Sequence, residues 1–126
     1  MRFLLATIIA FCAFLPAVCE ESGVKFYEKD YQNSWCSRHN GKTEVRLFDQ
    51  TRIDCLTDSH AIEFDFANKW GESIGQSLYY AAVVHKKPGI VLIMDNESDD
   101  RYLQRVKTVA NKYNIKVWTI SPKDLN

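Results

Sequence analysis

The 126-residue chain lacks net charge, because 16 lysine and arginine residues balance 16 aspartate and glutamate residues. A balanced chain has no overall attraction for nucleic acid, so any such contact needs a local patch of basic side chains. The chain also lacks internal repeats, low-complexity segments and stretches with the composition of a linker. We therefore expect one compact domain after the N-terminal segment.

Long apolar runs are also scarce. One stands at residues 3–15, and no later run is long enough to span a membrane. With Arg2 before it and Ala17-Val18-Cys19 after it, this run is typical of a secretory signal peptide over residues 1–19. The prediction is an exported protein, periplasmic or secreted, with a mature domain over residues 20–126. A lipoprotein acylated at Cys19 is the weaker alternative, since Val18 is a poor residue before a lipidated cysteine.

Cysteine is rare in the mature domain, where Cys36 and Cys55 remain. In an exported domain two cysteines most often form one structural disulfide, here between the first helix and the second strand. Two buried thiols are the alternative. No second cysteine or histidine stands at metal-ligand spacing, which argues against a Cys/His metal site. We expect His39, His60 and His85 at the surface.

The hydrophobic pattern predicts an αβββαβαβ order of elements. The expected helices are 27–39, 72–84 and 99–114, and the expected strands are 43–48, 52–56, 61–66, 90–94 and 116–120. Short turns join the first three strands, so they should form an antiparallel meander. The continuous apolar run 90–94 suits a parallel strand buried on both faces. Together they predict an α/β fold, a mixed sheet flanked by helices.

Details of the last two helices can also be predicted. Ser98 is suited to cap the helix that begins at Asp99, and Tyr113 falls on the inward face of that helix. In the preceding helix, Gly75 suggests close packing against a neighbour.

Three carboxylates mark the candidate site. Alternate side chains of a strand share a face, so Glu63 and Asp65 lie together, opposite Ile62 and Phe64. Asp54, on the preceding strand, joins them if the two strands pair. Carboxylates brought together repel and raise one another's pKa, and a hard divalent cation relieves that repulsion. Each carboxylate also has an explanation without a metal: Asp54 is solvated and paired with an arginine, Glu63 is exposed, and Asp65 forms an ion pair with a lysine.

The positions of these residues resemble the PD-(D/E)XK nuclease superfamily, whose restriction-endonuclease-like fold has an αβββαβ core. Asp54 matches the motif aspartate, Glu63 matches the acidic residue of the third strand, and Gln76 and Tyr80 match the pattern of the following helix. Glu28 matches a first-helix glutamate of some members. The last helix and strand would be additions to the core. The resemblance implies a Mg²⁺- or Mn²⁺-dependent phosphodiester hydrolase acting on DNA or RNA, with Asp54, Glu63 and Asp65 as metal ligands.

The chain departs from the motif at Asp65, where the family has its lysine. Lysines of this kind change position within the superfamily, and Lys69 is the candidate replacement. It stands just before the helix that carries Gln76, the other candidate catalytic residue. Three hypotheses remain: an exported nuclease, a catalytically inactive relative that binds protein or nucleic acid, and an interaction domain whose acidic patch is only solvated. Lys86 and Lys87 are candidates for backbone contacts, although a solvated helix end explains them as well.

Overall fold

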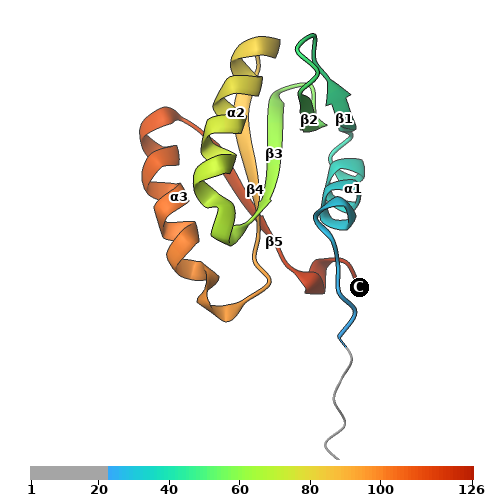
Figure 1. Ribbon diagram of the computed structural model, residues 1–126, viewed down its shortest axis with the longest axis vertical. Coiled ribbons are helices and arrows are strands. Elements are labelled where there is room, and N and C mark those ends of the chain that lie inside the picture. The colour runs from blue at the N-terminus through green and yellow to red at the C-terminus, as the bar shows by residue number, and fades with distance from the viewer. Residues whose placement is uncertain (1–22) are drawn as a thin grey trace, which may run out of the picture.

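A computed structural model of the chain describes residues 23–126, so the predicted signal peptide lies outside the described residues (Figure 1). The helices are α1 (Glu28–Arg38), α2 (Trp70–Val84) and α3 (Asp100–Tyr113), and the strands are β1 (Lys42–Arg46), β2 (Arg52–Leu56), β3 (His60–Phe66), β4 (Lys87–Ile93) and β5 (Lys116–Ile120). Single 3₁₀ turns occur at η1 (Ala67–Lys69), η2 (Glu97–Asp99) and η3 (Pro122–Asp124). The predicted order of elements is confirmed.

The strands form one mixed sheet in the order β1-β2-β3-β4-β5. β1, β2 and β3 are antiparallel, while β3, β4 and β5 run parallel. Each parallel connection passes through a helix, α2 after β3 and α3 after β4, as parallel neighbours require. The fold is therefore α/β, as predicted.

The helices cover the sheet on opposite faces (Figure 1). On one face, α1 packs Tyr31 and Trp35 against Phe64 of β3 and Val91 of β4. On the other, α2 and α3 lie side by side, and Val106 and Ala110 of α3 pack on the second face of β4. β4 is thus buried on both faces, and Ile90, Val91, Leu92 and Ile93 are each 0% exposed. Within residues 23–126 no helix combines the length and apolarity needed to cross a membrane.

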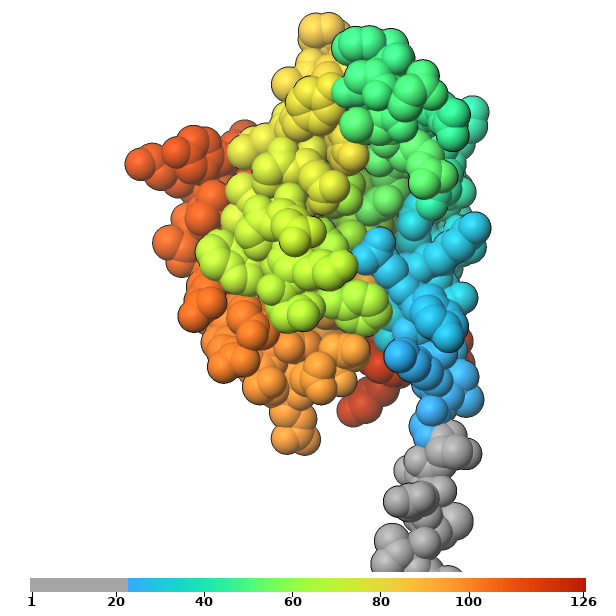
Figure 2. All heavy atoms as spheres, viewed as in Figure 1, coloured from blue at the N-terminus to red at the C-terminus, as the bar shows by residue number. Residues whose placement is uncertain are grey.

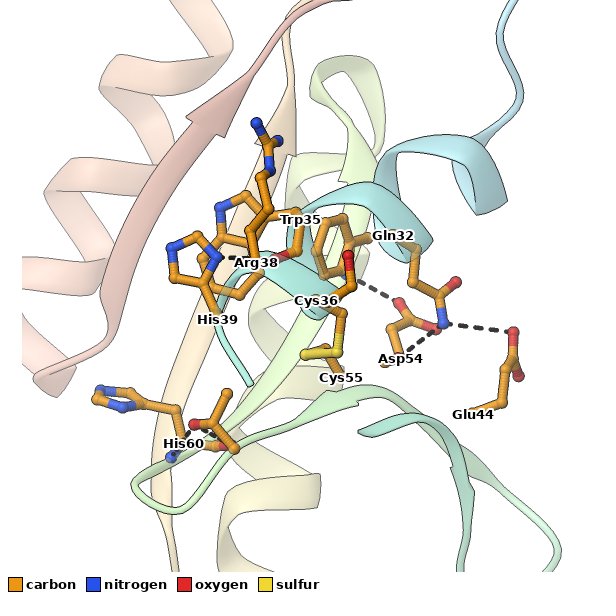
Figure 3. The surroundings of a disulfide bond; sticks show 12 residues. Gln32, Trp35, Cys36, Arg38, His39, Glu44, Asp54, Cys55 and His60 are labelled. Atoms are coloured by element: carbon orange, nitrogen blue, oxygen red, sulfur yellow. Dashed lines mark hydrogen bonds between the residues drawn. A yellow bond between two sulfur atoms is a disulfide. The ribbon is translucent and has the colours of Figure 1, made fainter. Parts of the chain in front are cut away.

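The predicted disulfide between Cys36 and Cys55 is confirmed (Figure 3). It joins the last turn of α1 to β2, with 5.8 Å between the two Cα atoms. Gly41 follows the helix and approaches both sulfurs so closely that a Cβ atom there would lie 2.5 and 2.6 Å from them. The position therefore accepts no side chain unless the disulfide moves.

Several local predictions are wrong. The first strand ends at Arg46 rather than Phe48, because Leu47 accepts the hydrogen bond that closes the turn. Asp99, not Ser98, organises the start of α3, since its Oδ2 accepts from the N–H groups of Asp95 and Asn96. Tyr113 is 54% exposed. A Cβ atom added at Gly75 would meet no described atom within 4 Å, so no close packing occurs there.

Candidate functional site

The sheet opens between β2 and β3. The two strands pair at Cys55 with Ile62 and at Leu56 with Ala61, and then their ladder ends. Beyond that point the side chain of Asp54 takes the place of a backbone acceptor, because its Oδ2 accepts a hydrogen bond of 2.8 Å from the Phe64 N–H. The Asp54 carboxylate is consequently held at the opening.

Glu63 and Asp65 lie on the face that α2 covers. They stand beside Ile90 and Leu92 in the parallel register, and those two residues pack beneath α2 and α3. Each acidic residue is 6% exposed, so the alternative of an exposed Glu63 is wrong. Glu63 Oε2 and Asp65 Oδ2 are buried without a hydrogen-bond partner among residues 23–126. Buried polar atoms are normally paired, so these two require an explanation.

A cavity of about 800 Å³ opens over this position. We call it the carboxylate cavity, after Glu28, Glu44, Asp54 and Glu63, which all line it. Its walls come from the N-terminal segment with α1, from the β1–β2 hairpin, and from α2; Figure 2 shows this face, with α1 in blue beside the yellow-green start of α2. The remaining walls include two predicted residues of α2, Gln76 and Tyr80, and three basic residues, Lys25, Lys29 and Arg52.

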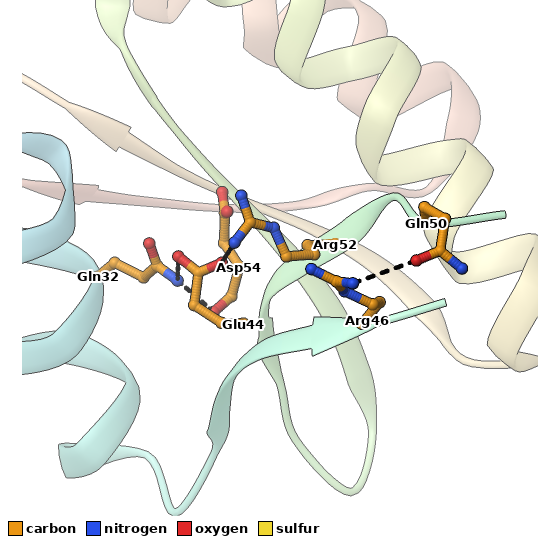
Figure 4. Close-up of polar contacts among 6 residues, drawn as sticks. All are labelled: Gln32, Glu44, Arg46, Gln50, Arg52 and Asp54. Carbon is orange, nitrogen blue, oxygen red and sulfur yellow. Dashed lines mark hydrogen bonds and ion pairs between the residues drawn. The ribbon is translucent and has the colours of Figure 1, made fainter. Parts of the chain in front are cut away.

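Gln32 and Glu44 are functional candidates that the sequence reasoning missed (Figure 4). Gln32 is 2% exposed, and its Nε2 donates to the backbone oxygen of Asp54 at 2.7 Å and to Glu44 Oε1 at 3.4 Å. Glu44 has a φ of 55°, a left-handed conformation that is uncommon for a non-glycine residue. It also pairs with Arg52 at 3.5 Å. The one available signal was spacing, since Gln32 follows Glu28 by one helical turn.

Burial dominates the electrostatics of the site. It raises the pKa of Asp54 to about 6, although the hydrogen bond from Phe64 opposes the rise. Burial, followed by the charges of Asp54 and Asp65, raises the pKa of Glu63 far above its ordinary value. Burial and then the charge of Glu28 raise the pKa of Asp65 to about 7. Near neutral pH, with nothing else bound, Glu63 therefore retains its proton and Asp65 is about half protonated, whereas Asp54 is mostly ionised.

Lys69 lies at the edge of this acidic group. It is exposed at the end of η1, close enough to lower the pKa of both Glu28 and Asp65, but it borders a neighbouring hollow instead of the carboxylate cavity. Asp65 does not line the carboxylate cavity either. The structure therefore brings Asp54, Glu63 and Gln76 together, with Asp65 and Lys69 beside them.

The donor set can be compared with the needs of a divalent cation. Among residues 23–126, no three His, Cys, Asp or Glu side chains are grouped as ligands for a metal ion. Mg²⁺ commonly uses one or two carboxylates, with water and substrate oxygens in the other positions. Asp54 and Glu63, the second with an unpaired oxygen, meet that smaller requirement. These two residues fit Mg²⁺ or Mn²⁺, while a site enclosed entirely by protein ligands is not formed within the described part.

The histidines lie outside the carboxylate cavity. His39 and His85 are exposed, as predicted, but His60 is half-buried, with its ring centroid 5.5 Å from that of Trp118.

Comparisons with known proteins give one distant likeness. The chain is 31% identical over 88 residues to a KilA-N domain-containing protein of Acanthamoeba polyphaga mimivirus. The match covers 70% of this chain and 24% of the viral protein, so the chain spans about a quarter of that relative. No family model matches the chain. No solved structure matches it either.

Proposed function

We propose that the protein is an exported, metal-dependent phosphodiester hydrolase related to the PD-(D/E)XK nucleases, with Asp54 and Glu63 as its metal ligands. Support comes from the order of elements and from the residues that share the carboxylate cavity. The observation that carries the proposal is the pair at the opening of the sheet. Asp54 is fixed there by the Phe64 N–H, and Glu63, with an unpaired buried oxygen, lines the same cavity.

A bound Mg²⁺ or Mn²⁺ would supply a Lewis acid for the phosphoryl oxygen and a water of lowered pKa. The chain's own residues have separable roles. Asp54 and Glu63 hold the cation, and Gln76 hydrogen-bonds the phosphate or the attacking water from α2. Lys69 stabilises the charge that develops on the phosphoryl group, because the lysine side chain is a compact positive charge on a flexible stem.

Asp65 contributes differently from the lysine that it replaces. Asp65 is buried and does not line the carboxylate cavity. Lys69 lies close enough to lower the pKa of Asp65. We assign it to holding Lys69 at the edge of the site, with direct contact to the cation as the other role that its unpaired oxygen permits.

Cleavage assays on the mature protein test this proposal. With Mn²⁺ or Mg²⁺, the wild type should cleave single-stranded DNA, duplex DNA or RNA, and a chelator should abolish that activity. Asp54→Asn and Glu63→Gln should each reduce cleavage at least about a hundredfold, as expected when transition-state stabilisation of several kcal/mol is lost. Asp100→Asn, at an exposed position of α3, is the matched control. A wild type that cuts none of these substrates would contradict the proposal.

The second candidate is an inactive relative that binds a partner through the same fold. Two observations favour it: an aspartate stands at the position of the motif lysine, and Lys69 lines a neighbouring hollow instead of the carboxylate cavity. The variant Lys69→Ala separates the two functions. In an enzyme it reduces cleavage and leaves metal binding intact, whereas in an inactive relative there is no activity for it to reduce.

A further inference from the structure

A second cavity, of about 300 Å³, lies where α1 ends and the β2–β3 turn begins. Four ring side chains line it, Trp35, His39, His60 and Trp118, and we call it the aromatic cavity. They come from α1 and the residue that follows it, from β3 and from β5, so the fold assembles them from distant parts of the sequence. None of the four lines the carboxylate cavity, and the proposed chemistry uses none of them.

The four rings follow one another in contact. His39 stacks on Trp35 with centroids 3.5 Å apart, Trp35 meets Trp118 edge-on at 5.1 Å, and Trp118 meets His60 at 5.5 Å. Figure 3 shows the stack of Trp35 and His39, with His60 reaching the region from the β2–β3 turn. A hollow bordered by aromatic rings favours a ligand that is itself flat and aromatic, because offset and edge-on ring contacts stabilise beyond their buried area.

Hydrogen bonds hold this cavity in a fixed shape. His39 Nδ1 donates to the Trp35 carbonyl at 2.7 Å, which leaves Nε2 of the neutral ring as an acceptor. His60 Nδ1 bonds Ser59 Oγ at 2.7 Å, and the Thr57 side chain accepts from the His60 N–H at 3.0 Å. A cavity that is already formed requires little ordering when a ligand binds.

Gly89 makes room for one of the walls. A Cβ atom at this position of β4 would lie 2.9 Å from the Trp118 ring and 3.1 Å from Ile62. The indole can therefore lie against the sheet at this position because the residue beneath it has no side chain.

Three lysines lie near the aromatic cavity, although none lines it and Asp58 does. Lys116 Nζ lies 5.8 Å from the centre of the Trp118 ring. Lys87 and Lys116 are close enough to His60 to lower its pKa, after the larger effect of burial. Lys86 Nζ donates to the Asp58 carbonyl in the turn that borders the cavity, at 2.6 Å. Lys86, Lys87 and Lys116 outnumber Asp58 here, so in a chain that is neutral as a whole this region has a local excess of positive charge.

We propose that the aromatic cavity binds an unpaired nucleobase of a single-stranded nucleic acid, with Lys87 and Lys116 contacting the adjoining phosphates. Aromatic platforms flanked by basic groups are the physical basis of single-strand binding, in which each base stacks on a ring and the backbone follows the positive charge. A neutral sugar would use the aromatic rings but would gain no charge attraction from the lysines. A paired base could not enter, because both of its faces are stacked within the duplex.

This inference does not depend on catalysis in the carboxylate cavity. If the proposed function also holds, the substrate is a single strand that passes both cavities. His60 and Glu63 are three residues apart on β3, which places their Cα atoms about 10 Å from each other and their side chains on opposite faces of the strand.

Tryptophan fluorescence gives a direct test, because two of the three tryptophans line the aromatic cavity. The third, Trp70, is removed with Trp70→Phe, and Asp54→Asn with a chelator prevents cleavage. A short poly-dT strand should quench the remaining fluorescence in a saturable way. An abasic strand of the same length and charge, and the same strand in a duplex, should quench much less. A methyl pyranoside that quenches while poly-dT does not would overturn the proposal.

Variants of the cavity sharpen this test. Trp118→Ala should weaken binding of poly-dT about 5- to 150-fold, while Trp118→Phe should retain most of it. Lys116→Gln and Lys87→Gln, both at exposed positions, should each reduce the slope of log K against log salt by about 0.7, and Lys107→Gln on α3 should leave it unchanged. Equal binding of the abasic strand, or unchanged slopes in both lysine variants, would contradict the proposal even if Trp118→Ala fails to fold.

Discussion

The two halves of the sheet are built differently. In the parallel half, β3 pairs with β4 along its whole length, from His60 with Lys87 to Phe66 with Ile93. In the antiparallel half, β3 pairs with β2 at two positions before a side chain, Asp54, takes over as acceptor. The complete ladder is apolar on both faces of β4, whereas the interrupted one contains carboxylates with unpaired oxygens.

We infer from this difference that the parallel half provides most of the stability, while the antiparallel half contains the candidate site. The parallel half satisfies its backbone groups and buries large apolar side chains, which is where most folding free energy arises. The opening beside β2 departs from the usual structural preferences in two ways, because carboxyl groups are buried there and Glu44 adopts a positive φ. Such departures persist where the surrounding structure supports them, and they concentrate at functional sites.

The largest expected effect comes from the regular half. Phe64→Ala removes a fully buried ring that packs on Trp35, and it should lower the free energy of unfolding by about 3–5 kcal/mol. Gln76→Ala, at an exposed position of α2 facing the carboxylate cavity, should change it by less than about 0.5 kcal/mol. Urea unfolding of both variants measures the contrast, and equal losses would show that the two halves are not distinguished in this way.

Loss of the disulfide should come next. The bond closes a sequence separation of 19 residues and ties α1 to the interrupted half of the sheet. Replacing Cys36 and Cys55 by serine should cost about 3 kcal/mol in the chain-entropy model. Thermal unfolding with and without reductant provides the measurement, and a wild type that is insensitive to reductant while its thiols become reactive would contradict this expectation.

An effect with a distinctive pH dependence is expected for Glu63→Gln. The folded-state pKa values of Asp54, Glu63 and Asp65 are raised, so the folded protein binds more protons than the unfolded chain. Stability without metal should therefore fall as pH rises above about 4, with each group contributing up to about 1.4 kcal/mol per pH unit until its folded pKa is passed.

Glu63→Gln removes one of these groups. It should be nearly neutral near pH 4.5 and stabilising near pH 7.5, and chemical denaturation at the two pH values would measure this. Glu97→Gln, at an exposed position, is the matched control. A wild type whose stability increases with pH over this range would show that the carboxyl groups are charged in the fold.

The smallest effect is expected for the ion pair at the rim. Arg52 and Glu44 form it with side chains 57% and 36% exposed, so solvent screens the attraction. Arg52→Gln should change the free energy of unfolding by less than about 1 kcal/mol. A larger loss in the same urea assay would indicate that the pair, and not Gln32, fixes Glu44.

The convergence of Asp54 and Glu63 could be predicted from the sequence. A short turn between the two strands brings them side by side, although their ladder ends at Cys55 and the Phe64 N–H, not strand pairing, holds Asp54. The bounds of β2 and β5 were also predicted to the residue, because turn residues flank both apolar patterns. The disulfide followed from two cysteines in a domain expected to be exported.

The rest of the site depends on tertiary structure. Alternation in β3 places Glu63 and Asp65 on a polar face, but only the packing of α2 over that face buries them. Gln32 and Glu44 meet because α1 lies against β2 and because Glu44 adopts a positive φ, which no strand pattern encodes. The aromatic cavity likewise joins Trp35 and His39, one helical turn apart, to His60 and Trp118, which no sequence spacing connects to them.

Calorimetric titration of the mature protein with Mn²⁺ near pH 7.5 tests the central claim most directly. Wild type should bind the ion and release protons, because Glu63, whose raised pKa keeps it protonated at this pH, must lose its proton to act as a ligand. Asp54→Asn and Glu63→Gln should abolish binding, while Lys69→Ala and the control Glu97→Gln should retain it. Absence of Mn²⁺ binding by folded wild type, or binding that survives in both carboxylate variants, would contradict the assignment of this cavity as a metal site.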